Sequence, residues 1–259
     1  MHYLIAISYA IVLWWVSTGI IIILYRQARW TYDATFGGMS IVAAACAVAL
    51  YLLRENSETW AVYASFSAGT VVWGWNLASY YTGFITGQRV ELPALPLTNR
   101  QRFVFAVKST IHHELVSLLL LGGALWSIPG ATNPTGFVTI VLFYVLHLLA
   151  KLNIYFGVHN FSGEWLPAHL SYITAFFGPA RTHWFFVFTV SIATACTIWA
   201  TGIAIQSSQS HLQIAGAFWA LLSGAGLLEL LVLMIPSAYL HRVLAFLTHL
   251  SVAASTKPR

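Results

Sequence analysis

Residues 136–158 read GFVTIVLFYVLHLLAKLNIYFGV, an almost unbroken apolar run that contains one charge, Lys151. A helix needs about 20 mostly apolar residues to cross a bilayer, so this run predicts a transmembrane helix. Its unbroken character is not the alternating pattern of a membrane β-barrel. Six more runs are similar, the second being the shortest: Tyr3–Tyr25, Gly37–Leu53, Trp60–Thr86, Phe103–Ser127, His183–Gln206 and Ile214–Ile235.

The composition indicates the same class. Of the 259 residues, 59% are hydrophobic and 7% are charged, whereas a soluble domain carries about 25% charged residues. This excludes a soluble domain, and a disordered chain would be richer still in charge. Cys46 and Cys196 form no disulfide or metal-binding framework. We therefore expect one all-α, polytopic membrane domain over residues 1–259, with about seven transmembrane helices.

Basic residues predict the orientation of these helices. With seven spans, one side of the membrane holds Arg54 alone, and the other side holds Arg26, Arg29, Arg89, Arg100, Arg102, Lys108, Arg181, Arg242, Lys257 and Arg259. Because cytoplasmic loops are enriched in Lys and Arg, the N-terminus is predicted to lie outside and the C-terminus in the cytoplasm. The basic residues do not cluster as in a nucleic-acid-binding protein, so membrane lipids are the expected partners.

Three cytoplasmic segments are more than simple connections. Residues 87–102 contain Pro93 and Pro96 and predict an ordered irregular loop. Residues 159–182 and 238–253 are amphipathic, and each is expected to lie at the membrane interface, the second as a C-terminal helix.

Several ionisable or polar residues fall inside or beside the predicted spans, where a charge costs about 2.5–3.5 kcal/mol and indicates function. The fourth and fifth spans form a hairpin that turns near residue 131, which puts Glu114 level with His147 and Lys151 level with Thr110. Lys151 is expected to pair with Glu114 or Glu229. The whole predicted cluster, in the cytoplasmic half, consists of His112, His113, Glu114, His147, Lys151, Asn153 and Glu229.

Three interpretations of this cluster remain open: an ion-pair and hydrogen-bond network that holds the helices in register, a site for a pigment, quinone or metal, and a proton or ion path. His159, Glu164 and His169 in the cytoplasmic segment could reach it. Trp73 and Trp75 either pack a neighbouring helix against Gly74 or form a flat aromatic wall for a pigment or quinone ring.

Spacing excludes several familiar sites. The seventh span has no lysine for a retinal Schiff base, and no closely spaced histidine boxes, HExxH, Walker or GxGxxG motif occurs. A haem held between two histidines needs both at one depth on facing helices. His113 and His147 nearly meet this condition, but hairpin helices are expected to be too close to admit a porphyrin.

The sequence resembles the PuhE family of photosynthetic complex assembly proteins over most of residues 70–236. The matching motifs, in order, are Val72-Trp73-Gly74-Trp75, Thr82-Gly83, Thr86-Gly87-Gln88-Arg89, Arg102-Phe103, His113-Glu114-Leu115, Ala150-Lys151-Leu152-Asn153, Phe156-Gly157-Val158, Asn160, Glu164, Leu166-Pro167, His169-Leu170, Tyr172, Leu228-Glu229 and Pro236.

This resemblance implies an inner-membrane factor, without catalytic residues, for the assembly or maturation of reaction-centre and light-harvesting complexes. Subunits of those complexes are its implied partners, and bacteriochlorophyll or another tetrapyrrole is the cofactor class that it implies. The rival hypothesis is a metal-dependent membrane enzyme acting on a tetrapyrrole or lipid at His112, His113, Glu114 and His147. A third is a transporter.

Overall fold

The computed structural model describes residues 2–88, 97–161, 163 and 166–236, and all regular structure in these ranges is helical. The long helices are α1 (His2–Arg26), α2 (Tyr32–Leu52), α3 (Thr59–Tyr81), α4 (Asn99–Ser127), α5 (Thr135–Phe156), α6 (Trp184–Gln206) and α7 (Ser210–Met234). Two short 3-10 helices, η1 (Arg29–Thr31) and η3 (Ala168–Phe176), lie between them. The predicted all-α membrane fold is confirmed, while the predicted interfacial helix at 238–253 lies outside the described residues.

Six of the long helices, all except α3, are long and apolar enough to cross a membrane. Helix α3 has 23 residues but carries buried polar side chains such as Ser65, Asn76 and Ser79. It contacts α1, α2, α4, α5 and α7, so these side chains meet protein and not lipid. Small and polar residues are favoured where membrane helices contact one another. The low hydropathy of α3 thus reflects its central position.

Several helix boundaries differ from the sequence prediction, and three of them have a clear local cause. Helix α2 begins at Tyr32, five residues before the predicted Gly37, with Asp33 in its first turn, where an acid favours the helix dipole. Helix α3 ends at Tyr81 and not at Thr86, because the chain turns at Gly83 (φ +89°). Helix α4 begins at Asn99 because Thr98 and Gln101 form a capping box.

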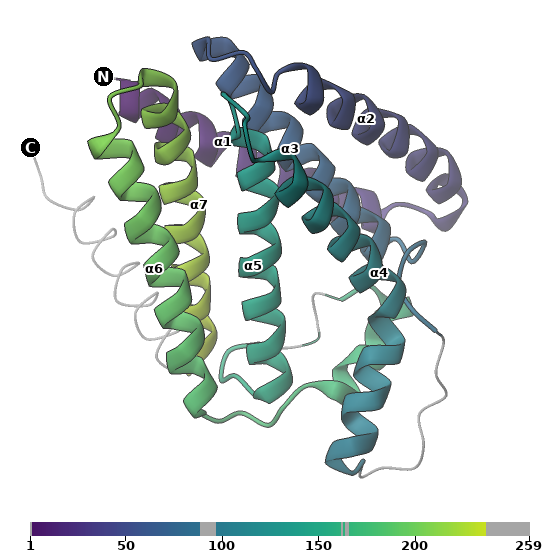
Figure 1. Cartoon of the computed structure of the whole chain (residues 1–259). Helices are drawn as coiled ribbons and strands as arrows, with labels where there is room; N and C mark the ends of the chain where they lie inside the picture. The colour runs from purple at the N-terminus through teal and green to yellow at the C-terminus, as the bar shows by residue number, and fades with distance from the viewer. Residues whose placement is uncertain (1, 89–96, 162, 164–165, 237–259) are drawn as a thin grey trace, which may run out of the picture.

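The helices form a bundle in which α5 lies between two flanks (Figure 1). Helices α6 and α7 pack side by side on one flank, and α2 and α4 lie on the other. Helix α1 crosses α3 and α7 and contacts both. Helices α1, α3, α5 and α7 therefore enclose the middle of the protein.

The connections sort to the two ends of the bundle as the alternating topology predicts. Arg54 donates to the carbonyl of Pro129 (2.7 Å), which joins the α2–α3 loop to the α4–α5 loop. The His211 ring is hydrogen-bonded to the carbonyl of Thr132 (3.2 Å), and the Tyr3 hydroxyl donates to the carbonyl of Ala204 (2.8 Å). These bonds gather the start of α1 and three loops at the end that holds Arg54. The described Arg26, Arg29, Arg100, Arg102 and Arg181 lie at the connections of the other end.

An extended segment after α3 inserts its backbone against α4. The N–H of Gln88 donates to the carbonyl of Lys108 (2.8 Å), and the N–H of His113 donates to the carbonyl of Thr86 (2.9 Å). These groups would otherwise serve the hydrogen-bond ladder of α4, and inserting a partner into such a ladder bends a helix. Helix α4 changes direction near its middle (Figure 1). Gly87 permits the approach, because a Cβ there would meet the backbone of Lys108 and Ser109.

The half of the bundle that contains the Arg54 end is tightly packed. Phe66 of α3 and Phe218 of α7 are stacked with ring centroids 4.2 Å apart, and both are almost fully buried. Ala6 and Ala10 are completely buried, so α1 approaches this core closely. Such dense packing gives the membrane helices a fixed arrangement without help from water exclusion.

We predict that Gly87→Val destabilises the protein by about 1–3 kcal/mol, since the new side chain must displace backbone and not a flexible side chain. The free energy of unfolding in mixed detergent micelles measures this. Gly122→Val is the matched control, because nothing lies within 4 Å of a Cβ at Gly122. Equal stability of the two variants would contradict the inserted backbone.

Candidate functional site

Helices α1, α3, α5 and α7 enclose a cavity of about 460 Å³ in the half of the bundle away from Arg54. This volume is within the usual range of about 300–1,000 Å³ for small-molecule sites. Its walls are mainly aromatic and aliphatic. The lining residues are Trp14, Ser17, Thr18, Ile21, Ile22, Tyr25, Thr70, Trp73, Gly74, Leu77, Tyr81, Phe143, Leu146, His147, Ala150, Phe161, Leu166, Leu222, Gly226 and Glu229.

The cavity exists because small side chains replace large ones on the inner helix faces. On α3, the helical repeat that places Phe66 in the packed half brings Gly74 to the cavity. On α7, the same face carries Phe218 in the packed half and Gly226 at the cavity. Ala150 is the small residue on α5. The sequence thus builds one dense half and one hollow half on the same helices.

One imidazole and one carboxyl group are among the described side chains that line this apolar space, those of His147 of α5 and Glu229 of α7. Glu229 is exposed, and no hydrogen bond or ion pair to it is found within the described ranges. The hydroxyls of Ser17 and Thr70 donate to carbonyls of their own helices (each 2.9 Å), so their protons are already used. Glu229 and His147 are therefore the groups best placed to interact with a ligand in the cavity.

The segment that follows α5 covers one end of the cavity. The backbone N–H groups of His159 and Asn160 both donate to the carbonyl of Leu233 near the end of α7 (each 3.0 Å). This anchors the chain so that Phe161 and Leu166 line the cavity.

The candidate residues of segment 159–182 do not converge on the intramembrane cluster. The Asn160 side chain donates to the carbonyl of Val232 (3.4 Å), and the His159 ring is hydrogen-bonded to Thr182 (3.2 Å). His169 lies beside Gly83, at the end of α3. Glu164 lies outside the described residues. Asn160 and His159 thus fasten the segment to its surroundings.

Lys151 and Glu114 form an ion pair between α5 and α4. Lys151 also donates to the Thr110 hydroxyl (3.2 Å). Both charged side chains are partly covered, with exposed fractions of 34% for Lys151 and 25% for Glu114. The predicted pairing of Lys151 with an acid and the predicted depth match of the hairpin are confirmed.

His113 and His147 connect this ion pair to the cavity. The two rings are 5.8 Å apart between centroids, and the His113 ring is 4.7 Å from that of Tyr80. His113 is fully buried, and neither of its ring nitrogens has a hydrogen-bond partner within the described parts of the chain. The two rings contact each other, which leaves no space for a porphyrin between them in this arrangement.

Two members of the predicted cluster lie elsewhere, which corrects the prediction. His112 is exposed on α4, on a different face from its neighbour His113. Asn153 is buried, and its side chain donates to the Leu149 carbonyl (2.8 Å) and to the Thr189 hydroxyl of α6 (2.9 Å). Adjacent or next-but-one positions of a helix point in different directions, so closeness in sequence did not mean a shared face.

Of the two residues predicted either to pack a helix or to form an aromatic wall, Trp73 lines the cavity and Trp75 does not. Trp73 faces α5, where it is parallel to Phe143 (centroids 6.2 Å apart) and edge-on to His147 (5.7 Å). The Trp75 indole donates to the Ser40 hydroxyl of α2 (3.0 Å). Only Trp73 belongs to the cavity, whereas Trp75 holds α2 to α3.

The contribution of α1 was missing from the sequence prediction. Trp14, Ser17, Thr18 and Tyr25 line the cavity, and positions 14, 18 and 25 are four and seven residues apart in an otherwise apolar run. This spacing is the signal that could have identified the inward face of α1.

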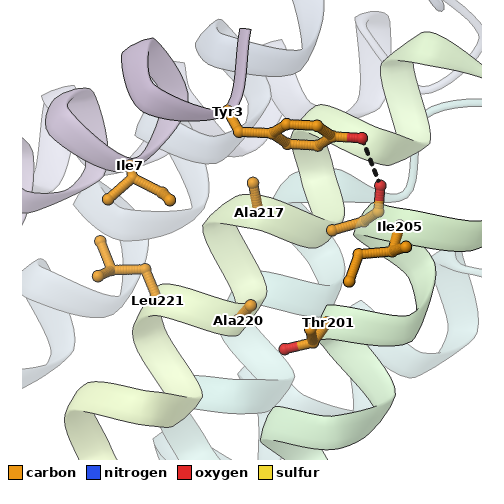
Figure 2. Close-up of a pocket in the computed structure, with 8 residues that line it drawn as sticks. Tyr3, Ile7, Thr201, Ile205, Ala217, Ala220 and Leu221 are labelled. Atoms are coloured by element: carbon orange, nitrogen blue, oxygen red, sulfur yellow. Dashed lines mark hydrogen bonds between the residues drawn. The ribbon is translucent and has the colours of Figure 1, made fainter. Parts of the chain in front are cut away.

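A second hollow, of about 350 Å³, lies between α1, α6 and α7 (Figure 2). Apart from Tyr3 and Thr201 its lining side chains are aliphatic, and both hydroxyls donate to helix carbonyls. It offers a shallow apolar groove to lipid and no polar group for chemistry.

No group of three or more His, Cys, Asp or Glu side chains that could hold a metal ion occurs in the part of the chain that the structure describes. The rival prediction placed His112, His113, Glu114 and His147 around one ion. Because His112 points away and Glu114 is paired with Lys151, these four side chains do not form such a group.

The sequence matches the family described as "Protein of unknown function (DUF3623)" over residues 1–244. The chain belongs to the DUF3623 family. This DUF3623 protein is 26% identical over 195 residues to a Rhodobacter capsulatus protein named "Uncharacterized 30.4 kDa protein in puhA 5'region". The aligned region covers 72% of this chain and 70% of that relative. No solved structure matches the DUF3623 chain.

We predict that Lys151→Met destabilises this DUF3623 protein, because it leaves the Glu114 carboxylate without its counterion. The loss should exceed the ~0.6 kcal/mol of an average hydrogen bond between membrane helices. It should stay below the ~3–5 kcal/mol reported for fully buried pairs, since both side chains are partly exposed. Unfolding in mixed micelles measures it. The double variant Lys151→Met/Glu114→Gln should recover most of the loss, and a double variant as unstable as Lys151→Met would contradict this account.

Proposed function

We propose that this protein is a bacterial inner-membrane factor for the assembly or maturation of photosynthetic reaction-centre and light-harvesting complexes. The observation that carries the proposal is the Rhodobacter capsulatus relative, whose name places it in the region 5' of puhA in a phototroph. The ordered series of motifs that resembles the PuhE family supports the same role.

The arrangement of the polar residues supports a non-catalytic role. Glu114 and Lys151 neutralise each other in a closed pair. Asn153 is used between α5 and α6. A closed network of this kind holds helices in register.

The outer helix faces are suited to contacts with other membrane subunits. Helices α2 and α4 lie on one flank of the bundle and expose large aliphatic side chains, among them Ile41, Val42, Leu118 and Leu119. Subunits of the photosynthetic complexes are the partners that we propose for these faces. The more specific form of the proposal is that the protein handles bacteriochlorophyll or another tetrapyrrole.

We predict that deleting the gene lowers the amount of mature photosynthetic complexes, measured by near-infrared absorption of the membranes. Complementation with the wild-type chain should restore them, and Glu229→Gln should restore them only partly while the protein reaches its normal level by immunoblot. Glu229 has no partner in the described residues, so an isosteric amide should not affect folding.

Glu55→Gln is the control, since its exposed side chain contacts only Arg54 and the Thr132 hydroxyl among the described residues, at the opposite end of the bundle. Normal complex levels in the deletion strain would refute the assembly role. Normal complex levels in the Glu229→Gln strain alone would show that Glu229 has no part in assembly.

We further predict a periplasmic N-terminus and a cytoplasmic C-terminus, from the Lys and Arg distribution. An alkaline phosphatase reporter fused after Arg259 should be inactive, and one inserted in the α6–α7 loop at Gln209 should be active. The opposite pair of results would invert the topology.

A further inference from the structure

We propose that the cavity between α1, α3, α5 and α7 binds an isoprenoid quinone, a neutral flat ring with carbonyl acceptors and an aliphatic tail. This inference rests on the cavity and adds a ligand to the proposed assembly role.

The charge of the lining excludes an anionic headgroup. No Lys or Arg is among the described residues that line the cavity, and the nearest cation along α5, Lys151, is neutralised by Glu114 on the α4 side. A phosphate or carboxylate in the cavity would face Glu229 without a counterion, and an unpaired charge inside a membrane is costly. The ligand must therefore be neutral or cationic, which rules out anionic phospholipids.

The hydrogen-bonding groups exclude a pure hydrocarbon. Glu229 lies on α7 and His147 on α5, so the two groups approach the cavity from different helices. The Tyr81 side chain joins them from α3. An imidazole N–H, a phenol and a protonated carboxyl group all donate hydrogen bonds. Quinone carbonyls accept hydrogen bonds, and a hydrocarbon chain would leave these polar groups without partners.

The aromatic walls favour a small flat ring. Trp73 and Phe143 are parallel, with an interplanar angle of 3°, and Trp14, Tyr25 and Phe161 complete the aromatic lining. Aromatic rings pack well against such faces in offset-stacked or edge-to-face geometry. Isoleucine and leucine side chains of α1, α3, α5 and α7 supply the aliphatic surface that an isoprenoid tail requires.

The surroundings of His147 disfavour a macrocycle bound through a central metal. Trp73 and His113 contact the His147 ring edge-on, at 5.7 Å and 5.8 Å between centroids. A tetrapyrrole coordinated by this histidine would need open space on every side of the coordinating nitrogen. A quinone needs only one hydrogen bond from the ring, so it fits a histidine that is packed on two sides.

Binding of decylubiquinone to the full-length protein in detergent tests the proposal. Trp14 and Trp73 line the cavity, so a bound quinone should quench part of the tryptophan fluorescence with a saturable dependence on concentration. Isothermal titration calorimetry gives the Kd independently. Lipid extraction and chromatography of protein purified from its own membranes should also recover a quinone in near-stoichiometric amount.

Gly74→Leu is the decisive variant. A Cβ at Gly74 meets only the tip of Ile21, at 3.9 Å, so the larger side chain can enter the cavity without displacing backbone. It should weaken decylubiquinone binding at least tenfold. Gly122→Leu is the matched control on the outside of α4, where nothing lies within 4 Å, and should leave the Kd unchanged. His147→Phe keeps an aromatic ring but loses the hydrogen bond, and it should weaken binding about fivefold.

Non-saturable quenching, or equal Kd values for the wild-type and Gly74→Leu chains, would overturn the quinone site. Bacteriochlorophyll that copurifies and is lost in Gly74→Leu would also overturn it, and would support the pigment form of the proposed function. The Gly74→Leu chain could also lose quinone binding while its strain has normal amounts of photosynthetic complexes. This result would support the quinone site and show that assembly does not depend on it.

Discussion

The ion pair between Lys151 and Glu114 is the constraint on which the middle of this protein depends. An ammonium group inside a membrane span is tolerated only with a partner, so α4 and α5 must meet at this depth. Once they do, His113 of α4 is brought against His147 of α5. His147 in turn forms part of the cavity wall. The need to compensate the charge of Lys151 thus helps to fix the position of His147 in the cavity wall.

The second constraint is the need to satisfy backbone groups where the helices are irregular. The inserted Thr86–Gln88 segment supplies one donor and one acceptor to α4, so the bent helix loses little hydrogen bonding. The bend lets α4 contact both α5 and η3. Only a glycine at position 87 allows two backbones to approach this closely. The Thr-Gly-Gln motif is thereby explained by packing and not by chemistry.

The sequence was sufficient to predict features that depend on a single residue type or on the hydropathy pattern. Hydropathy located the helices, hairpin symmetry placed Glu114 near the depth of Lys151, and the sorting of Arg residues located the ends of the bundle. The direction in which a side chain points depends on how its helix is rotated, and the sequence alone did not predict that rotation. Trp75 and Asn153 point to α2 and α6, because their directions are set by which helices are neighbours.

Helix α3 shows the limit of hydropathy as a guide. Its buried Ser65, Asn76 and Ser79 lower its apolar character, yet these residues are what allow neighbours to surround it. Asn76 donates to the Ser117 hydroxyl of α4 (2.8 Å), for example, and Ser65 accepts from the backbone N–H of Gly136 of α5 (3.0 Å). A weakly apolar span within a polytopic sequence is therefore a signal for the central helix.

The contrast between Glu114 and Glu229 is the strongest physical reason to assign a ligand to the cavity. Both carboxyl groups lie on long apolar helices, but Glu114 is compensated by Lys151, whereas Glu229 faces an aromatic hollow. A carboxyl group placed in a membrane without a partner destabilises the protein, and helix packing alone does not offset this cost. The small residues Gly74, Ala150 and Gly226 likewise give up contacts that larger side chains would make. Both losses occur at one place in the bundle, and a neutral ring that accepts hydrogen bonds would offset both.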